Sequence, residues 1–286
     1  MVDKALLNEW FAIPPDELSA RSPIPLRILT TPDEVHRDFA ATMFEEIREA
    51  REAGRALRII VPIGPTAHYP MLAERVNESG LALDHVTFFG MDEWLDWEGR
   101  PLPLTDLRSF EGQFHRLFLD RLEPALLPPA DNVIFPTPAD LERSAREIER
   151  RGPVSTTYGG FGFQGHIAFN EPPSTRWSAV SVEELRHSHT RVLPISVDTL
   201  FVMAQRIAGG NVFAIPPMAV TLGMRDLLAA KRIRLYSVSG PWKGAILRIL
   251  LLSEPTVEFP ATLLHGHPDV EIIVEADAAE CPMACL

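Results

Sequence analysis

The sequence contains little cysteine and, for its length, little positive charge. Its 286 residues include only two cysteines, Cys281 and Cys285, and both lie near the C-terminus. Two thiols so close together cannot build a disulfide framework, so we interpret them as bystanders in a reducing compartment. With 27 basic against 39 acidic residues, the formal net charge is −12. A surface for nucleic acid or for an anionic membrane requires the opposite sign, so we expect neither partner.

Long apolar runs are also missing. No stretch is long enough to span a bilayer, and the opening "MVDKALLNEWFAIPPDEL" lacks the basic–apolar–small order of a signal peptide. We therefore expect a cytoplasmic protein. Any anionic ligand must be held by a few local cations and backbone amides, because the overall charge repels it. The sequence leaves the oligomeric state open, a homo-oligomer included.

The 46% of hydrophobic residues are enough for one large core. Residues 1–26 are rich in proline and carry Trp10 and Phe11, which predicts an N-terminal arm that packs on the body. We find no internal repeat, no low-complexity segment and no linker. Residues 27–286 are therefore predicted to form a single α/β domain.

Short apolar strands alternate with helices along this domain. Thr31-Pro32-Asp33-Glu34 has the features of a helix start, and Val35, Phe39, Met43 and Ile47 then repeat every four residues. The pattern predicts strands at 57–61, 85–90, 132–135, 155–158, 232–240 and 270–275, and helices at 109–122, 139–152 and 241–251. Such alternation predicts a three-layer α/β/α sandwich around a mostly parallel, Rossmann-like sheet.

Polar residues follow four of these strands directly. The loop "IGPT" follows the strand at 57–61, Asp92 and Glu93 follow the next, His166 follows the strand at 155–158, and Lys243 follows the strand at 232–240. Ligands of open α/β sheets bind at the C-terminal ends of the strands, where the strand order reverses. We therefore expect these groups to share one crevice. Taken singly, Asp92 also fits a helix N-cap, and Lys243 a surface charge.

The segment "GGFGFQGHIAFNEP" (159–172) combines several glycines with candidate catalytic side chains. Its glycines indicate that the backbone must approach something closely, and His166 with Glu171 indicates proton transfer. A satisfied core histidine and a surface glutamate are the alternative. The neutral Gln164 stands where a proton relay would favour a carboxylate.

Two other motifs are less specific. "PIGPTAHYP" (62–70) fits a phosphate-binding loop before a helix, or an ordinary turn, since Pro65 has no N–H to donate. The pairs "HSH" (187–189) and "HGH" (265–267) could each direct two imidazoles the same way, but neither has further ligands at a fixed spacing. We therefore predict no metal site and no cofactor.

Together these segments resemble the glucosamine-6-phosphate deaminase (isomerase) family, in the group that also contains 6-phosphogluconolactonases. The segment at 159–172 resembles the family pattern G-G-x-G-x-D-G-H-x-A-F-N-E-P. "FGMDEW" looks like F-N-M-D-E-Y, "VPIGPT" like P-T-G-G-T-P, and "HSHTRV" and "GPWKG" complete the set in the right order. The resemblance covers about residues 27–275. Lactonases typically continue with A-S-L-F-P after the histidine, so "HIAFNEP" favours the deaminase branch.

The resemblance implies an aldose–ketose isomerase/deaminase that converts an amino-sugar phosphate such as glucosamine 6-phosphate, with water, to fructose 6-phosphate and ammonia. Asp92 then matches the base that moves a proton from C2 to C1 of the opened sugar. His166 matches the acid/base that opens the ring, with Glu171 orienting and charging it. The implied phosphate-binding residues are Gly64, Pro65, Thr66, Arg191 and Lys243.

Two departures from the family pattern fall within the implied site. Gln164 replaces an aspartate, and an amide adds no negative charge to raise the pKa of His166. Pro65 replaces the second glycine of the phosphate loop. Both departures point to a substrate that differs from glucosamine 6-phosphate. A sugar-phosphate lactonase and a non-catalytic sugar-phosphate sensor are the alternatives.

Overall fold

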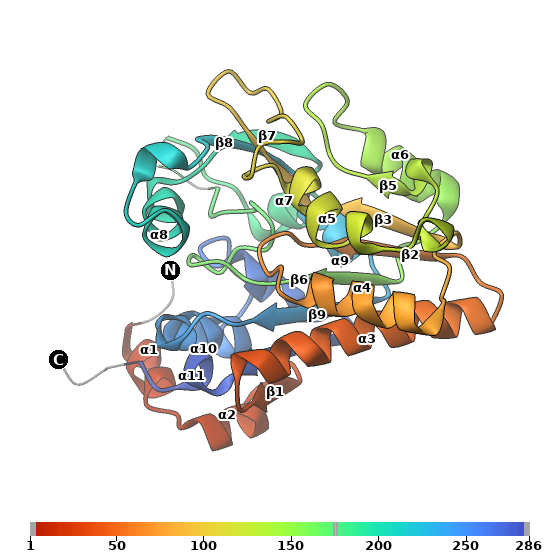
Figure 1. The fold of residues 1–286 in the computed structure, drawn as a ribbon. Helices are drawn as coiled ribbons and strands as arrows, with labels where there is room; N and C mark the ends of the chain where they lie inside the picture. Colours follow the sequence, from red (N-terminus) through yellow and green to blue (C-terminus); the bar gives the residue numbers. More distant parts are fainter. Residues whose placement is uncertain (1–3, 174, 176, 283–286) are drawn as a thin grey trace.

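The computed structural model describes residues 4–173, 175 and 177–282 (Figure 1). Its main sheet is parallel throughout and has seven strands in the order β1-β10-β9-β6-β2-β3-β5. These strands are β1 (Leu26–Leu29), β2 (Leu57–Val61), β3 (Val86–Gly90), β5 (Val133–Ile134), β6 (Thr156–Gly159), β9 (Arg232–Ser237) and β10 (Val270–Glu275). A smaller antiparallel sheet, in the order β4-β8-β7, consists of β4 (Asp92–Leu95), β7 (Arg191–Pro194) and β8 (Met218–Thr221).

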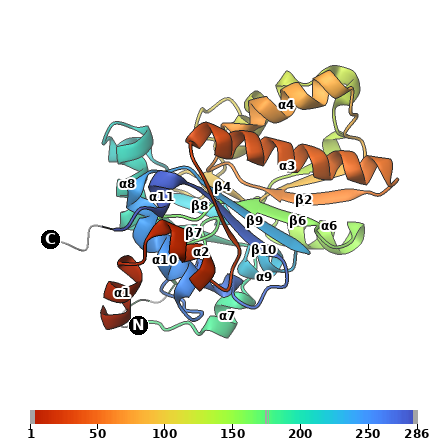
Figure 2. The same ribbon diagram turned by 90° about the horizontal axis from the view of Figure 1, so that it is seen from below.

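Helices cover both faces of the main sheet (Figure 2). One face carries α3 (Pro32–Glu52), α4 (His68–Ser79) and α5 (Phe110–Leu117). The other carries α1 (Lys4–Phe11), α2 (Pro15–Arg21), α6 (Arg143–Arg151), α9 (Met224–Leu228) and α10 (Gly244–Leu252). The shorter α7 (Val182–Arg186) and α11 (Ala276–Ala279) complete this side, and α8 (Val197–Ile207) lies near the small sheet. The predicted three-layer sandwich is confirmed.

Strand alternation divides the buried side chains between two cores. Ile59 and Val61 point into the core under α3 and α4, whereas Ile60 between them points into the opposite core under α10. On β10, Ile273 and its neighbour Ile272 are divided in the same way. A strand buried on both faces has no polar side, which explains its continuous apolar run.

The predicted start of α3 is confirmed. Thr31 accepts a hydrogen bond from the Glu34 N–H at 3.2 Å, and the Glu34 carboxylate accepts from the Thr31 N–H at 3.2 Å. This reciprocal pair is a capping box. Val35, Phe39, Met43 and Ile47, the residues of the predicted apolar repeat, are all fully buried.

Several predicted boundaries differ from the structure. The helix expected at 109–122 ends at Leu117 and continues as the 3₁₀ turn Leu119–Arg121, and the helix expected at 139–152 begins only at Arg143. The 3₁₀ turn Pro241–Lys243 precedes α10. The helix N-cap considered for Asp92 is wrong, because Asp92 and Glu93 open strand β4 and pair with Thr221 and Val220.

The strand order reverses between β2 and β6. From β2 the chain builds outward through β3 to β5, and it then returns to add β6, β9 and β10 on the other side of β2. Such a reversal leaves a crevice at the C-terminal ends of the two central strands. The loop after β2 and the glycine-rich segment after β6 border this crevice.

Both terminal segments meet at a buried arginine of α10. The guanidinium of Arg248 donates to the carbonyl of Ile13 at 2.6 Å and to the carbonyls of Ala279 and Glu280 at 3.0 Å each. Cys281 Sγ donates to the same Ile13 carbonyl at 3.2 Å; Cys285 lies outside the described residues. The residues of the predicted arm that the structure describes thus lie against the C-terminal segment. No described helix is both long and apolar enough to cross a membrane.

Candidate active site

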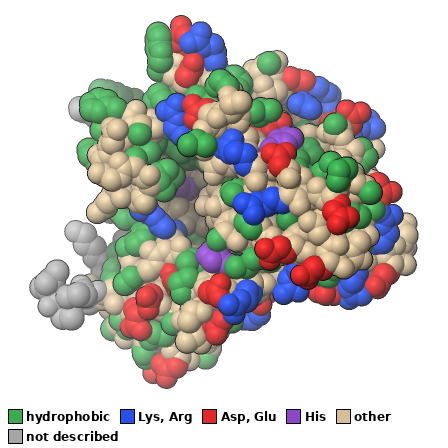
Figure 3. Space-filling view, in the orientation of Figure 1, with side chains coloured by type: hydrophobic (Ala, Val, Ile, Leu, Met, Phe, Trp, Pro, Cys, Tyr) green, Lys and Arg blue, Asp and Glu red, His purple; other side chains and the backbone are tan. Residues whose placement is uncertain are grey.

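A cavity of about 250 Å³ lies at the switch point, at the C-terminal ends of the central strands. In the space-filling view it is a hollow in the surface between α8 and the body of the sheet (Figure 3). Its polar lining side chains come from five segments of the chain: Asp92, His166, Thr199, Arg206, Ser237, Ser239 and Lys243. Asp92, His166 and Lys243 were expected to share a crevice, and the structure brings them together.

The glycines of segment 159–172 give space to His166. A Cβ atom on Gly162 would lie 1.8 Å from His166 Nε2, so no other residue fits there without displacing the imidazole. Gly165 has a φ of +63°, in the left-handed region that glycine adopts without strain. The Gly162 N–H donates to the His166 carbonyl at 2.8 Å and closes the turn. The backbone must therefore approach the histidine itself.

The second half of the segment is anchored to the small sheet. Asn170 is fully buried and donates to the carbonyls of Ile167 at 3.1 Å and Leu222 at 2.9 Å. The Phe169 N–H donates to Thr221 Oγ1 at 3.2 Å. Between the bonded Ile167 carbonyl and the Phe169 N–H lies Ala168, which lines the cavity and has a φ of +53°, uncommon for a residue with a side chain. The anchors on either side hold this conformation.

The adjacent carboxylates Asp92 and Glu93 have different surroundings. Glu93 accepts from the N–H groups of Trp94 at 2.7 Å, Phe110 at 2.8 Å and Glu111 at 2.8 Å, and from Ser109 Oγ at 3.2 Å. It therefore caps the N-terminus of α5. Asp92 points into the cavity instead. Burial, together with the charge of Glu93, raises the pKa of Asp92 well above its ordinary value, which makes its carboxylate a stronger base.

His166 is buried and neutral at ordinary pH. Burial, followed by the charge of Lys243, lowers its pKa to about 3. Its Nδ1 has no hydrogen-bond partner among the described residues. Its surroundings therefore keep the imidazole neutral, and Nδ1 can hydrogen-bond a ligand.

Glu171 is not hydrogen-bonded to His166, which corrects the orienting contact that the resemblance implied, and Gln164 is not bonded to His166 either. The Glu171 carboxylate accepts from the Ser196 N–H at 2.8 Å and from Ser196 Oγ at 3.0 Å. Ser196 Oγ also lies 3.1 Å from Gln164 Oε1, and Gln164 Nε2 donates to Asp198 at 2.9 Å. Ser196 is the N-cap of α8. Both residues, one before and one after His166 in the chain, therefore hold the start of this helix.

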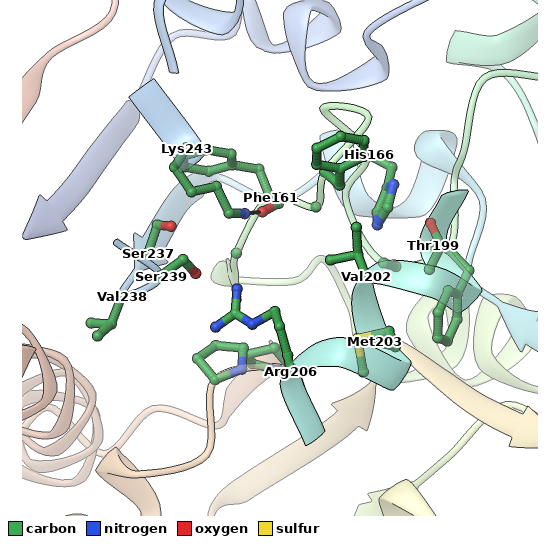
Figure 4. Close-up of a pocket in the computed structure, with 18 of the residues that line it drawn as sticks. Phe161, His166, Thr199, Val202, Met203, Arg206, Ser237, Val238, Ser239 and Lys243 are labelled. Carbon is green, nitrogen blue, oxygen red and sulfur yellow. Dashed lines mark hydrogen bonds between the residues drawn. The ribbon is translucent and has the colours of Figure 1, made fainter. Parts of the chain in front are cut away.

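The cations of the cavity are Lys243 and Arg206. Lys243 is only 3% exposed, donates to the Phe161 carbonyl and lies 4.4 Å from the centroid of the Phe161 ring. Burial, followed by the charge of Arg206, lowers the pKa of Lys243 to about 7. Arg206 extends from α8 into the cavity (Figure 4) and lies 5.0 Å from the centroid of the Trp242 ring. Two cations close enough for one to lower the pKa of the other favour an anionic ligand, even in an acidic protein.

Arg191, the other cation expected at the site, does not line this cavity. It begins β7, and its Nη1 donates to the His189 carbonyl at 3.4 Å. Arg206 was missed because helix α8 was not predicted. The signal was present in the sequence, since Ser196 is a good N-cap and Arg206 lies seven residues, about two turns, beyond Thr199 on the same helical face.

The loop after β2 contributes Gly64 and Pro65 to the cavity, whereas Thr66 is not part of the lining. The Thr66 carbonyl accepts from the Tyr69 N–H at 3.1 Å, in the turn that leads into α4. On the opposite side, Glu275 accepts from the N–H groups of Ser239 and Gly240 at 2.5 Å each. Those two amides are therefore occupied, and the hydroxyl groups of Ser237 and Ser239 remain for a ligand.

The histidine pairs are held by the protein. His265 Nε2 lies 2.7 Å from the Leu250 carbonyl, and His267 Nε2 lies 2.8 Å from the Ala230 carbonyl. His187 Nδ1 lies 3.0 Å from the Glu183 carbonyl. Among the described residues no group of three or more His, Cys, Asp or Glu side chains could hold a metal ion.

This fold is shared with solved structures of sugar-phosphate enzymes. A monomeric glucosamine-6-phosphate deaminase has a TM-score of 0.74 at 23% identity, over 90% of this chain and 99% of that chain. A 6-phosphogluconolactonase from Trypanosoma brucei has a TM-score of 0.63 at 18% identity, over 91% and 98%. The parallel sheet and its switch-point cavity, lined by a carboxylate, an imidazole and two cations, define an α/β protein of the same fold.

Sequence relatives identify the family. No family model matches the chain. The glucosamine-6-phosphate deaminase of Staphylococcus haemolyticus is 32% identical over 213 residues, which are 72% of this chain and 79% of that protein. That of Shouchella clausii is 28% identical over 256 residues, 86% of this chain and 93% of that protein. The chain belongs to the glucosamine-6-phosphate deaminase family.

Proposed function

We propose that the chain is an aldose–ketose isomerase/deaminase that converts glucosamine 6-phosphate, or a close amino-sugar phosphate, and water to the ketose phosphate and ammonia. The observation that carries this proposal is that Asp92 and His166 line the same cavity as Lys243 and Arg206. The cavity thus offers acid–base groups together with positive charge.

The phosphate binds between Arg206 and Lys243, with the Ser237 and Ser239 hydroxyls and the loop at Gly64 and Pro65 around it. Each cation makes a charge-assisted hydrogen bond to the dianion, and the buried position strengthens the attraction. The bound dianion also offsets the charge repulsion that lowers the pKa of Lys243. This assignment puts Arg206 in the role that the family resemblance implied for Arg191.

Asp92 removes the proton from C2 of the opened sugar and returns it to C1. Its raised pKa brings it closer to the operating pH, as a base in proton transfer requires. The neutral His166 exchanges a proton with the ring oxygen as the ring opens. Glu171 and Gln164 act through Ser196, by holding α8 against the cavity. Water then replaces nitrogen at C2, and ammonia leaves.

Asp92→Asn tests the proposal, because it keeps the shape of the side chain and removes its basicity. We expect turnover of glucosamine 6-phosphate to fall at least about 100-fold while the protein stays folded. Incorporation of solvent deuterium at C1 of the product should fall in parallel. Asp120→Asn, at an exposed position, is the matched control. Deuterium exchange at the normal rate in Asp92→Asn would assign the base to another residue.

Arg206→Ala and Lys243→Ala test the phosphate site. Each should weaken binding of glucosamine 6-phosphate by about 1.5–3 kcal/mol, the range for a hydrogen bond to a charged group. Arg191→Ala is the control, because Arg191 does not line the cavity. Weaker binding in Arg191→Ala alone would place the phosphate elsewhere.

Hydrolysis of 6-phosphogluconolactone by the wild type, without any turnover of glucosamine 6-phosphate, would favour the lactonase. Binding without turnover of either compound would favour the sensor.

A further inference from the structure

Thr199 has a buried hydroxyl without a hydrogen-bond partner in the part of the chain that the structure describes. The residue is 5% exposed, lines the cavity, and its Oγ1 has no hydrogen bond to any described residue. An unsatisfied buried hydroxyl is costly, so such groups are normally paired. His166 Nδ1 and Ser237 Oγ are in the same situation in this cavity. The proposed function uses His166 in ring opening and the Ser237 hydroxyl beside the phosphate, but it assigns no role to Thr199.

The position of Thr199 on α8 relates it to the phosphate site. Thr199, Val202, Met203, Arg206 and Ile207 all line the cavity, at the spacing of one helical face. Seven residues separate Thr199 from Arg206, a rise of about 10 Å along the helix. In Figure 4 the Arg206 side chain points toward the side of the cavity with Lys243, and Thr199 lies on the side with His166. This face of α8 thus runs from the phosphate end of the cavity to the reacting end.

Between these ends the helix offers only apolar side chains, Val202 and Met203. They can contact the C–H groups of a ligand but cannot bind its hydroxyls. Thr199 is therefore the hydrogen-bonding side chain with which this face of α8 can bind the reacting half of a sugar.

Glu171 and Gln164, which are not bonded to His166, hold Thr199 in place through Ser196. Its N–H donates to Ser196 Oγ at 3.2 Å, and Ser196 is bonded to Glu171 and Gln164. The first turn of α8 is thus tied to the segment that carries His166. A hydroxyl on this turn is fixed relative to the imidazole.

We propose that Thr199 determines substrate specificity by hydrogen-bonding a hydroxyl on the reacting half of the sugar, while Arg206 two turns away binds the phosphate. The ligand class is a sugar phosphate with its phosphate and reacting carbons at opposite ends and a hydroxyl beside those carbons. This inference rests on the proposed function for the orientation of the sugar. It gives Gln164 and Glu171 a common role, which is to position Thr199.

The test compares Thr199→Val, which removes the hydroxyl and keeps the shape, with Thr199→Ser, which keeps the hydroxyl. Calorimetry gives the dissociation constants of glucosamine 6-phosphate and of inorganic phosphate, and their ratio isolates the contribution of the sugar. In Thr199→Val this contribution should fall about three- to tenfold, the loss of one neutral hydrogen bond, with phosphate binding unchanged. Thr199→Ser should stay within about twofold of the wild type. Thr190→Val is the matched control, because Thr190 is also buried and its Oγ1 has no partner among the described residues, but it does not line the cavity.

An unchanged sugar contribution in Thr199→Val would overturn the inference. So would an equal loss of sugar and phosphate binding in both variants, which would indicate a purely structural role. Because these are binding measurements, they are independent of turnover. Absence of wild-type turnover would refute the proposed function and leave the Thr199 comparison decisive.

Discussion

At the scale of single residues, Lys243 couples ligand binding to protonation. Its pKa of about 7 in the empty cavity means that the amine loses its proton as the pH rises through neutrality, and the neutral amine does not attract a dianion. We therefore expect the affinity for sulfate, which stays a dianion over this range, to fall by up to about tenfold per pH unit above pH 7. Calorimetry between pH 6 and 9 measures this fall, together with the uptake of protons on binding.

Lys243→Arg is the comparison for this prediction, since arginine stays charged over the whole range. Its sulfate affinity should be nearly flat from pH 6 to 9. A wild-type affinity that is just as flat would show that Lys243 keeps its proton in the empty cavity.

Gln164 gives a second prediction at this scale. Its amide donates to Asp198 and its carbonyl oxygen accepts from Ser196, so it needs one donor and one acceptor. Gln164→Asp removes the donor and places a second carboxylate beside Asp198. We expect kcat/KM for glucosamine 6-phosphate to fall several-fold, a loss of about 1 kcal/mol. The double variant Gln164→Asp with Asp198→Asn restores a donor and should recover most of the lost kcat/KM. A double-mutant cycle measures this recovery. A gain in kcat/KM for Gln164→Asp would instead indicate a direct relay to His166.

The prediction of a shared crevice is confirmed for three side chains in the loops and turns that follow strands of the main sheet. Asp92, His166 and Lys243 meet because parallel strands bring their C-terminal ends to one edge. Arg206 reaches the same cavity from a helix outside the β–α alternation. Its position depends on how α8 folds back over that edge, which strand spacing does not encode.

At the scale of elements, the strands and helices of the main sheet could be predicted from the sequence, whereas the small sheet could not. The strands β4, β7 and β8 have four residues each, and β7 ends in a proline. Runs this short show little periodicity, and a terminal proline argues against a strand in the sequence. Their pairing is fixed by tertiary contacts, such as the anchoring of Asn170 to Leu222.

Glu93 shows how one side chain holds an element at the site. Its carboxylate accepts from the Trp94 N–H and, at the start of α5, from two further backbone N–H groups and the Ser109 hydroxyl. Phe110 of this helix lines the cavity. Glu93→Gln replaces one acceptor oxygen by an NH₂ group that faces those donors. We expect the free energy of unfolding to fall by about 1–3 kcal/mol, measured by urea titration. Glu123→Gln, the same change at an exposed position, should stay within about 0.5 kcal/mol of the wild type. Equal stability of Glu93→Gln and the wild type would refute the capping role.

At the scale of the whole molecule, buried histidines link the stability of the fold to pH. His68 at the start of α4 is fully buried, and neither ring nitrogen has a hydrogen-bond partner among the described residues. Its ring stacks on Phe39 at a centroid distance of 3.7 Å, and Phe39 stacks on Tyr236 at 4.0 Å. Burial, followed by the charge of His36, lowers the pKa of His68 well below its ordinary value.

The sign of the pH effect follows from this lowered pKa. The unfolded chain binds a proton at His68 near pH 6.5, whereas the folded protein does not, so the folded state loses stability as the pH falls below about 6.5. Each such histidine contributes up to about 1.4 kcal/mol per pH unit to this loss of stability, and His166 contributes in the same direction as His68.

His68→Met tests this effect, because methionine has a similar volume and no titrating group. We expect it to change the free energy of unfolding at pH 7.5 by less than about 1.5 kcal/mol and to flatten the slope between pH 6.5 and 5, as urea unfolding at each pH measures. His187→Gln, at an exposed histidine, should keep the wild-type slope. If His68→Met keeps it as well, His68 is protonated within the folded core, and the acid sensitivity of the fold comes from other groups.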